Sequence, residues 1–173
     1  MKIFLSGYMG SGKSVIADYI SKKMRFPLVD LDDQISLIEE LSVAEIFANK
    51  GELYFRKLET KILEDVLEEP IDMVVALGGG TPCYGINIDL IKSHPEAKMI
   101  YLKASVDFLT QRLFDEKDTR PLISHLKSKE DLDDFIRKHL FERSYYYNQA
   151  DIIVDIENRD IDSISYEIIK KLV

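Results

Sequence analysis

Cysteine is nearly absent from this sequence, and so are long apolar runs. Cys83 is the only cysteine in 173 residues, so the chain cannot close a disulfide bridge on itself and carries no sign of an oxidising compartment. Charged residues interrupt every apolar stretch before it reaches the ~18 residues that a membrane span needs. Gly7 also follows the first apolar residues too soon for the core of a signal peptide. We therefore expect a cytoplasmic protein with no membrane partner.

Positive charge is scarce as well. The chain has 23 Lys and Arg residues against 31 Asp and Glu residues, for a formal net charge of -8. Such a balance argues against a broad basic surface for nucleic acid or anionic lipid. Small anionic ligands stay possible, because they need only a few positive groups gathered in one site.

The most specific motif lies near the start of the chain. Residues 7–14 fit the phosphate-binding pattern G-x-x-x-x-G-K-[ST], the P-loop, with strand-like residues before it and a helical pattern after it. The glycines let backbone N–H groups turn toward an anion, and the helix adds the positive end of its dipole. The residues expected to hold the phosphates of ATP are Gly10, Ser11, Gly12 and Lys13. The hydroxyl of Ser14 is expected to bind Mg²⁺. A chance match in a glycine-rich turn is the alternative.

Strand-like and helix-like patterns alternate along the rest of the chain. Short apolar segments typical of strands lie at residues 2–6, 28–29, 73–77, 99–102 and 152–154. Helical periods fill the intervals, as at Leu53, Phe55 and Leu58, and Ser42 with Glu45 predicts a helix start by a capping box. The alternation predicts an α/β fold, a three-layer P-loop NTPase domain over residues 1–173 with a central five-stranded parallel sheet flanked by helices.

Two carboxylates follow the second predicted strand. Asp30 and Asp32 stand two residues apart, so in extended chain both side chains point to the same side, at the sheet edge where ligands bind. One can hold the water shell of a metal ion, and the other can accept a proton from an attacking hydroxyl. The alternative is that Asp32 or Asp33 caps the following helix.

Three glycines, Gly78, Gly79 and Gly80, follow the third predicted strand at the same edge. Backbone without side chains can approach a ligand closely there. A flexible turn is an equally good interpretation of these residues alone.

Three arginines, Arg56, Arg120 and Arg143, stand out by their positions. Arg120 lies between Asp115 and Ser124, where no periodicity survives and charges mix with proline, as in a mobile surface loop. Taken singly, each arginine is more simply interpreted as an exposed residue in a weak surface ion pair.

Taken together, these motifs resemble the shikimate kinase family over nearly the whole chain. The matching segments are Gly7 to Ser14, Asp30-Leu31-Asp32, Gly51-Glu52 with Phe55-Arg56, Gly78-Gly79-Gly80, and Arg120-Pro121-Leu122. Many kinases share the first segment, and the combination is far more specific. The resemblance implies transfer of the γ-phosphoryl group of ATP to the 3-hydroxyl of shikimate, giving shikimate 3-phosphate and ADP in aromatic amino-acid biosynthesis.

The resemblance also implies roles for single residues. Asp30 would join Ser14 at the metal, and Asp32 would bind the substrate hydroxyls and act as the base. Arg56 and Arg143 would hold the substrate carboxylate. The other implied contacts are substrate for Gly78, Gly79 and Gly80, adenine for Arg112, and phosphate for Arg120 and Lys13. Substrate-binding helices are implied at about residues 31–68 and a lid at about residues 115–125.

One departure from the family pattern concerns Arg143. The family usually has proline two residues after this arginine, where Tyr145 stands here, and this leaves the direction of Arg143 open. A related gluconate or nucleoside-monophosphate kinase is one alternative function. A nucleotide-dependent switch that works through a protein partner is another. We expect a monomer that uses Mg²⁺ as cofactor and takes ATP and shikimate as its small-molecule partners.

Overall fold

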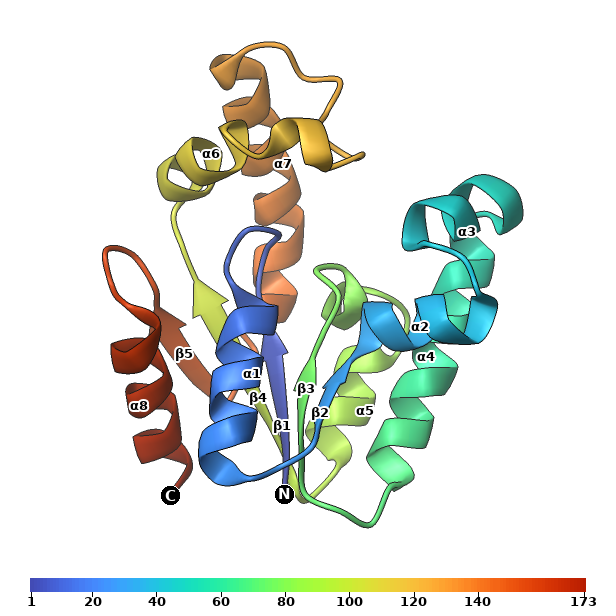
Figure 1. Cartoon of the computed structure of the whole chain (residues 1–173), viewed down its shortest axis with the longest axis vertical. Helices are drawn as coiled ribbons and strands as arrows, with labels where there is room; N and C mark the ends of the chain where they lie inside the picture. Colours follow the sequence, from blue (N-terminus) through green and yellow to red (C-terminus); the bar gives the residue numbers. More distant parts are fainter.

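Five parallel strands form the central sheet, as predicted. The structure is a computed structural model that describes all 173 residues. The strands are β1 (Lys2–Ser6), β2 (Leu28–Asp30), β3 (Met73–Ala76), β4 (Ala97–Lys103) and β5 (Ile152–Asp155). They pair in the order β2-β3-β1-β4-β5, and every pair is parallel (Figure 1). Because β1 is the central strand, the loop that follows it lies at the middle of the sheet's carboxyl edge.

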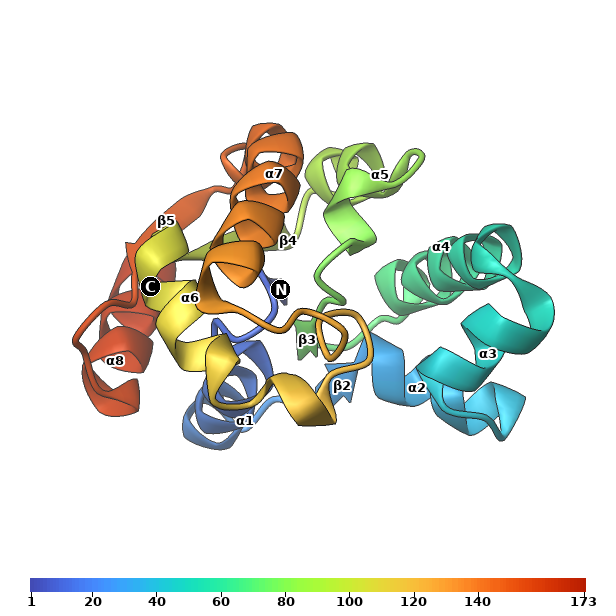
Figure 2. The same ribbon diagram turned by 90° about the horizontal axis from the view of Figure 1, so that it is seen from above.

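Helices cover both faces of the sheet because the strands are apolar on both sides. In β1, Ile3 and Leu5 belong to one core cluster, and Phe4 between them belongs to another. The first cluster includes side chains of α1 (Lys13–Met24) and α8 (Ile161–Leu172). The second includes side chains of α4 (Glu52–Glu68) and α5 (Asn87–Ser93). Figure 2 shows the two pairs of helices on opposite sides, which is the predicted three-layer arrangement.

The remaining helices stand around the carboxyl ends of the strands. They are α2 (Leu31–Glu39), α3 (Val43–Lys50), α6 (Val106–Phe114) and α7 (Lys129–Tyr147), with short 3₁₀ helices η1 (Thr81–Cys83) and η2 (Lys117–Thr119). Figure 1 shows α2 and α3 on one side of the P-loop, and α6 and the start of α7 on the other. Ser42 and Glu45 form both hydrogen bonds of the predicted capping box at α3. No helix has the length and apolar character needed to cross a membrane.

Two local details appear in the structure that the sequence patterns do not show. Leu53 continues the apolar period of α4, yet it is 66 % exposed, because it lies on the outer side of the first turn, where Phe55 faces the core. The segment from Asp115 to Ser124, predicted as a surface loop, is exposed along most of its length and also has local structure. It contains η2, and Ile123 is fully buried among core residues of α6 and α7. A single apolar side chain therefore anchors this segment between exposed neighbours.

Candidate active site

The loop between β1 and α1 has the conformation that an anion-binding loop needs. Gly10 and Gly12 have positive φ angles of 78° and 85°, which residues with side chains rarely adopt. Gly12 is also the N-cap of α1, and no side chain caps the helix there. The N–H groups of the first turn are therefore left to face a ligand. The buried hydroxyl of Ser11, in the same loop, has no hydrogen-bond partner within the protein.

Lys13 opens α1 and folds back over the loop. Its ammonium group donates hydrogen bonds to the carbonyl oxygens of Gly7 (2.8 Å) and Tyr8 (3.1 Å). Burial lowers the pKa of Lys13 to about 8, and the carboxylates of Asp32 and Asp30 oppose this shift. The lysine and the two aspartates are therefore close enough to act on one another, and they form one site.

Ser14 and Asp30 meet beside the phosphate-binding loop. The hydroxyl of Ser14 donates to Oδ2 of Asp30 at 2.9 Å. The other carboxylate oxygen, Oδ1, accepts hydrogen bonds from the N–H groups of Asp32 and Asp33 and so caps α2. The interpretation that Asp32 or Asp33 is the helix cap is therefore wrong. Because Asp30 takes that role, the side chain of Asp32 is left for chemistry.

The oxygens of Ser14 and Asp30 suit a magnesium ion. Mg²⁺ prefers oxygen ligands and is commonly held by one or two protein groups together with water and phosphate oxygens. The protein has no cluster of three or more His, Cys, Asp or Glu side chains that could hold a metal ion by itself. A hydroxyl and a carboxylate next to a phosphate cradle fit the donor set that Mg-ATP requires.

Asp32 is half-buried and titrates at an unusual pH. Burial raises the pKa of Asp32 to about 6, and the negative charges of Asp30 and Glu59 add to the shift. Lys13 and Arg56 oppose it. A carboxylate with this pKa is ionised at neutral pH and takes up a proton more readily than an ordinary aspartate. Asp32 thus has the properties of a general base.

The triple-glycine turn after β3 allows three charged side chains to touch the backbone. A Cβ atom added to Gly78 would lie 2.9 Å from Oδ1 of Asp32. A Cβ on Gly79 would lie 3.2 Å from Nη1 of Arg143, and one on Gly80 would lie 2.6 Å from Nη2 of Arg56. The turn therefore admits these side chains close to its backbone, and contact of the three glycines with a ligand stays a prediction.

Arg56 is held firmly at this turn. Its side chain is only 12 % exposed, and its Nη1 donates to Oε2 of the buried Glu59 at 2.9 Å. The guanidinium carbon stands 4.6 Å from the ring centre of Tyr84 and 5.3 Å from that of Phe55. The Nε atom is buried and has no hydrogen-bond partner within the protein. The interpretation of Arg56 as an exposed surface residue is wrong.

Arg143 points toward the same turn although the proline of the family pattern is missing. Its guanidinium stands over the ring of Tyr8 at 5.8 Å, next to Gly79. One turn later, the buried Tyr147 stacks on Tyr101 with ring centres 5.0 Å apart. The hydroxyl of Tyr147 also donates to the carbonyl oxygen of Gly79 at 2.5 Å. These aromatic contacts fix the end of α7 and, with it, the direction of Arg143.

A cavity of about 260 Å³ opens beside the phosphate-binding loop. Its polar lining includes Ser11 and Gly12 of the loop, Arg112 of α6, and Asn158 and Arg159 after β5. Arg112, which the resemblance assigns to adenine, therefore borders a space that adjoins the phosphate cradle.

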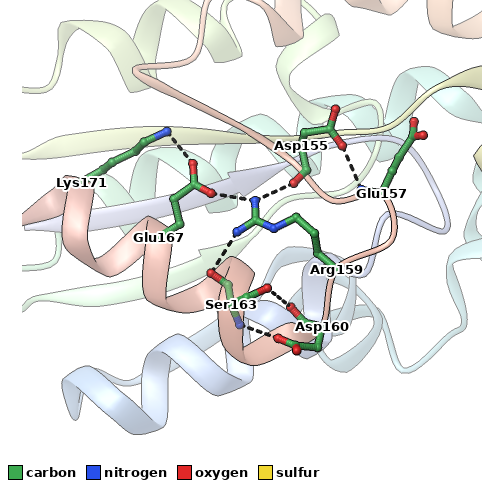
Figure 3. Close-up of polar contacts among 7 residues, drawn as sticks. All are labelled: Asp155, Glu157, Arg159, Asp160, Ser163, Glu167 and Lys171. Atoms are coloured by element: carbon green, nitrogen blue, oxygen red, sulfur yellow. Dashed lines mark hydrogen bonds and ion pairs between the residues drawn. The ribbon is translucent and has the colours of Figure 1, made fainter.

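Charged groups hold the segment that forms one wall of this cavity (Figure 3). Arg159 donates to the carbonyl oxygens of Asp155 at 3.0 Å and Ser163 at 3.1 Å. It also pairs with Glu167 at 2.7 Å, and Lys171 pairs with the other oxygen of Glu167 at 2.7 Å. The turn between β5 and α8 is thus braced by its own side chains.

Arg120 lies at the edge of the site. Its Nη2 pairs with Glu116 at 2.6 Å, one helical turn earlier, which is the surface ion pair suggested by the sequence alone. Its positive charge also contributes to the lowered pKa of Lys13, so the two groups sense each other. Arg120 is therefore close enough to the phosphate-binding loop to affect Lys13, while its ion pair is with Glu116.

Sequence reasoning missed several side chains that shape the site. Tyr8, inside the P-loop, shares a hydrogen bond of 3.0 Å with His139 of α7. Thr81 donates a 2.6 Å hydrogen bond to Glu59. The partners are 131 and 22 residues apart in the sequence, so no local pattern marks them. Arg159 is the exception: it lies in a polar turn directly after the last strand, and this position at the carboxyl edge of the sheet could have suggested contact with a ligand.

Comparison with known proteins identifies the family that has this architecture. A family model described as shikimate kinase matches residues 9–173. The chain belongs to the shikimate kinase family. The predicted shikimate kinase activity is confirmed, and with it a place in the shikimate pathway. The gluconate kinase, nucleotide kinase and switch alternatives are set aside.

Relatives and solved structures match the chain over nearly its full length. Shikimate kinase from Flavobacterium johnsoniae is 45% identical over 168 residues, which cover 97% of this chain and 96% of the relative. A crystal structure of shikimate kinase from Bacteroides thetaiotaomicron has a TM-score of 0.89 at 34% identity and covers 99% and 98% of the two chains. A shikimate kinase from Acinetobacter baumannii, solved in complex with shikimate, has a TM-score of 0.83 at 24% identity over 99% and 92% and shows the same fold.

Replacing Gly80 with alanine tests the close approach of Arg56. The new Cβ would lie 2.6 Å from Nη2 and 2.9 Å from Nη1 of Arg56, so the guanidinium of Arg56 must move. The φ of −92° at Gly80 suits alanine, so the fold should persist. We expect the KM for shikimate in this kinase to rise roughly tenfold, with the KM for ATP and the melting temperature little changed. An unchanged KM for shikimate in steady-state assays would contradict the prediction.

Proposed function

We propose that this site transfers the γ-phosphoryl group of Mg-ATP to the 3-hydroxyl of shikimate. The observation that carries the proposal is the triple-glycine turn, where Asp32, Arg56 and Arg143 converge. Gly79 of this turn also lies next to backbone atoms of the P-loop. A base and two guanidinium groups beside a phosphate cradle suit a hydroxylated carboxylate as acceptor. The shikimate bound to the Acinetobacter baumannii enzyme supports the same substrate here.

The nucleotide would lie along the amino end of α1. The N–H groups from Gly10 to Ser14 would surround the phosphates, and Lys13 would exchange its two carbonyl partners for phosphate oxygens. The adenine ring of the nucleotide would enter the cavity that Arg112 borders. Ser14 and Asp30 would hold Mg²⁺, whose chemical contribution when bound is to neutralise phosphate charge.

Asp32 would act as the general base of the transfer. The oxygen of the 3-hydroxyl attacks the γ-phosphorus while its proton passes to a carboxylate oxygen of Asp32. The bond between the γ-phosphorus and the bridging oxygen then breaks, and ADP leaves. Positive charge from Lys13 and Arg120 would stabilise the phosphoryl oxygens during the transfer.

The carboxylate of shikimate would bind Arg56 and Arg143. Glu59 occupies Nη1 of Arg56, whereas the buried Nε donates to no hydrogen-bond acceptor within the protein and has only Oε1 of the exposed Glu52 side chain, 3.8 Å away, as a loose ion-pair partner. The edge formed by Nε and Nη2 is therefore the part of the guanidinium suited to a two-point contact with a carboxylate. Arg143 would add a second positive charge from α7.

Residues of about 115–125 would form a lid over the nucleotide. Arg120 would leave its exposed ion pair with Glu116 and reach the phosphates, while the buried Ile123 keeps the segment attached to the core. Closure would exclude water, which otherwise competes as phosphoryl acceptor. We also propose that residues of about 31–68 serve as the substrate-binding helices. That the protein is a monomer and lies in the cytoplasm stays a prediction.

An assay of acceptors tests the proposed substrate. Purified enzyme with Mg-ATP should release ADP with shikimate, and not with gluconate or nucleoside monophosphates, because only shikimate offers a ring hydroxyl with a carboxylate for the two arginines. ³¹P NMR of the product should show a single ester at the 3-position. Turnover of gluconate or a nucleotide without turnover of shikimate would refute the proposal.

The pH dependence of the reaction tests the base. Asp32 must be ionised to accept a proton, and its pKa is about 6, so kcat/KM for shikimate at saturating Mg-ATP should fall roughly tenfold per pH unit below about pH 6. Asp32→Asn should lower kcat by roughly a thousandfold and leave the Kd for ATP nearly unchanged. A flat profile between pH 5 and 7, or a variant with normal kcat, would show that another group is the base.

Replacing each arginine in turn separates anchoring from catalysis. Arg56→Ala should raise the KM for shikimate by roughly a hundredfold, because it removes contacts made equally in the ground state and the transition state. Arg120→Ala should mainly lower kcat, because the charge it opposes grows during transfer. Steady-state kinetics with both substrates varied would distinguish the two patterns. Equal effects on KM and kcat in both variants would argue against separate roles.

A further inference from the structure

A chain of buried polar groups lies behind Arg56. The hydroxyl of Thr81, in η1, donates to Oε1 of Glu59 at 2.6 Å, and Oε2 of Glu59 accepts from Arg56 at 2.9 Å. Thr81 and Glu59 are both fully buried. Each oxygen of this carboxylate thus has its own donor, one from the turn and one from the arginine.

The backbone of Thr81 is itself held by a further hydrogen bond. The side chain of Asn87, at the start of α5, donates to the carbonyl oxygen of Thr81 at 2.9 Å. The oxygen of the Asn87 amide accepts from Thr60 of α4 at 2.7 Å. Asn87 is fully buried as well. The hydrogen bonds therefore link α4, η1 and α5, and they set the position of the Thr81 hydroxyl with little freedom.

A buried carboxylate that accepts a hydrogen bond from only one donor can do so with either of its two oxygens, and so in more than one orientation. The Thr81 hydroxyl removes this choice, because only one rotation of Glu59 satisfies both donors at 2.6 Å and 2.9 Å. With Glu59 fixed, Nη1 of Arg56 is the nitrogen that is occupied. A Cβ on Gly80, directly before Thr81, would lie 2.6 Å from Nη2, 2.9 Å from Nη1 and 3.1 Å from Cζ of Arg56, so the backbone of this turn lies close against the guanidinium. One turn therefore supplies both the wall and the donor that orient Arg56.

We propose that Thr81 is a positioning residue for recognition of the substrate carboxylate. Acting through Glu59, its hydroxyl sets which edge of the Arg56 guanidinium faces the substrate. The inference rests on the proposed role of Arg56 as the carboxylate anchor. Thr81 does not touch the reacting atoms, so its effect belongs to binding of the acid and not to phosphoryl transfer.

Thr81→Val, which keeps the shape and removes the hydroxyl, is the direct experiment. We expect the KM for shikimate to rise roughly tenfold, with kcat and the KM for ATP within about twofold of wild type. Thr81→Ser, which keeps the donor, should restore the KM for shikimate. Thr110→Val is the matched control, because Thr110 is an equally buried threonine on α6 without a bond to Arg56 or Glu59. It should leave the KM for shikimate unchanged.

The same substitution in an Arg56→Ala background separates this inference from the proposed function. If Thr81 acts through Arg56, Thr81→Val should add less than a twofold change to the KM for shikimate once Arg56 is gone. If Arg56→Ala alone leaves that KM unchanged, the carboxylate anchor itself is wrong. If Arg56→Ala raises it and Thr81→Val does not, or if the two effects multiply, only the role of Thr81 is overturned.

Folding of the variants is checked by circular dichroism and thermal melting. Thr81→Ala removes the same hydroxyl and leaves a small space, so it carries the same kinetic prediction if the valine variant does not fold. A loss of kcat, of ATP binding and of shikimate binding in equal proportion in every folded variant lacking the hydroxyl would identify a purely structural role and overturn the inference.

Discussion

The site depends on one constraint, the absence of side-chain atoms along the turn that follows β3. Asp32, Arg143 and Arg56 each lie within 3.2 Å of where a Cβ of Gly78, Gly79 or Gly80 would stand. Any larger residue would displace one of these charged groups, so the glycines decide where both the proposed base and the proposed anchors can be. The position of this turn depends on the strand order. Because β3 lies between β1 and β2, the turn after β3 lies beside both the P-loop and Asp30.

Charge is balanced locally within a protein that is acidic as a whole. Lys13 and the arginines share the site with Asp30, Asp32 and Glu59. The nearby carboxylates oppose the lowering of the Lys13 pKa by burial, and the nearby cations oppose the raising of the Asp32 pKa by burial. Burial alone would favour a neutral lysine and a neutral aspartate. The opposing charges keep the pKa of Asp32 at about 6 and that of Lys13 at about 8, so both groups are ionised between these values. The proposed phosphate-binding cation and the proposed proton acceptor can thus both be charged at neutral pH.

The sequence predicted the five strands, the helices and the P-loop, because strand and helix patterns and the P-loop motif are local. It left open whether the three glycines allow close approach and where Arg143 points, because both depend on packing between distant segments. The exposure of Leu53 has the same cause: a helical period predicts a helix but not how far the neighbouring elements cover it. Thr81 and Tyr8 were missed because their partners, Glu59 and His139, are joined to them only by the fold.

The difference between Arg56 and Arg120 shows how ion pairs can divide the work of a kinase. Arg120 pairs with Glu116 on the surface, and such an exposed pair contributes only ~0–1 kcal/mol. Leaving it for a phosphate would therefore cost little, as the proposed lid requires. Arg56 pairs with a carboxylate that is buried and held by Thr81, so a change of partner would leave a charge unpaired in the interior. Arg56 is thereby kept in place, and in its proposed role as carboxylate anchor this would lower the loss of conformational entropy on binding.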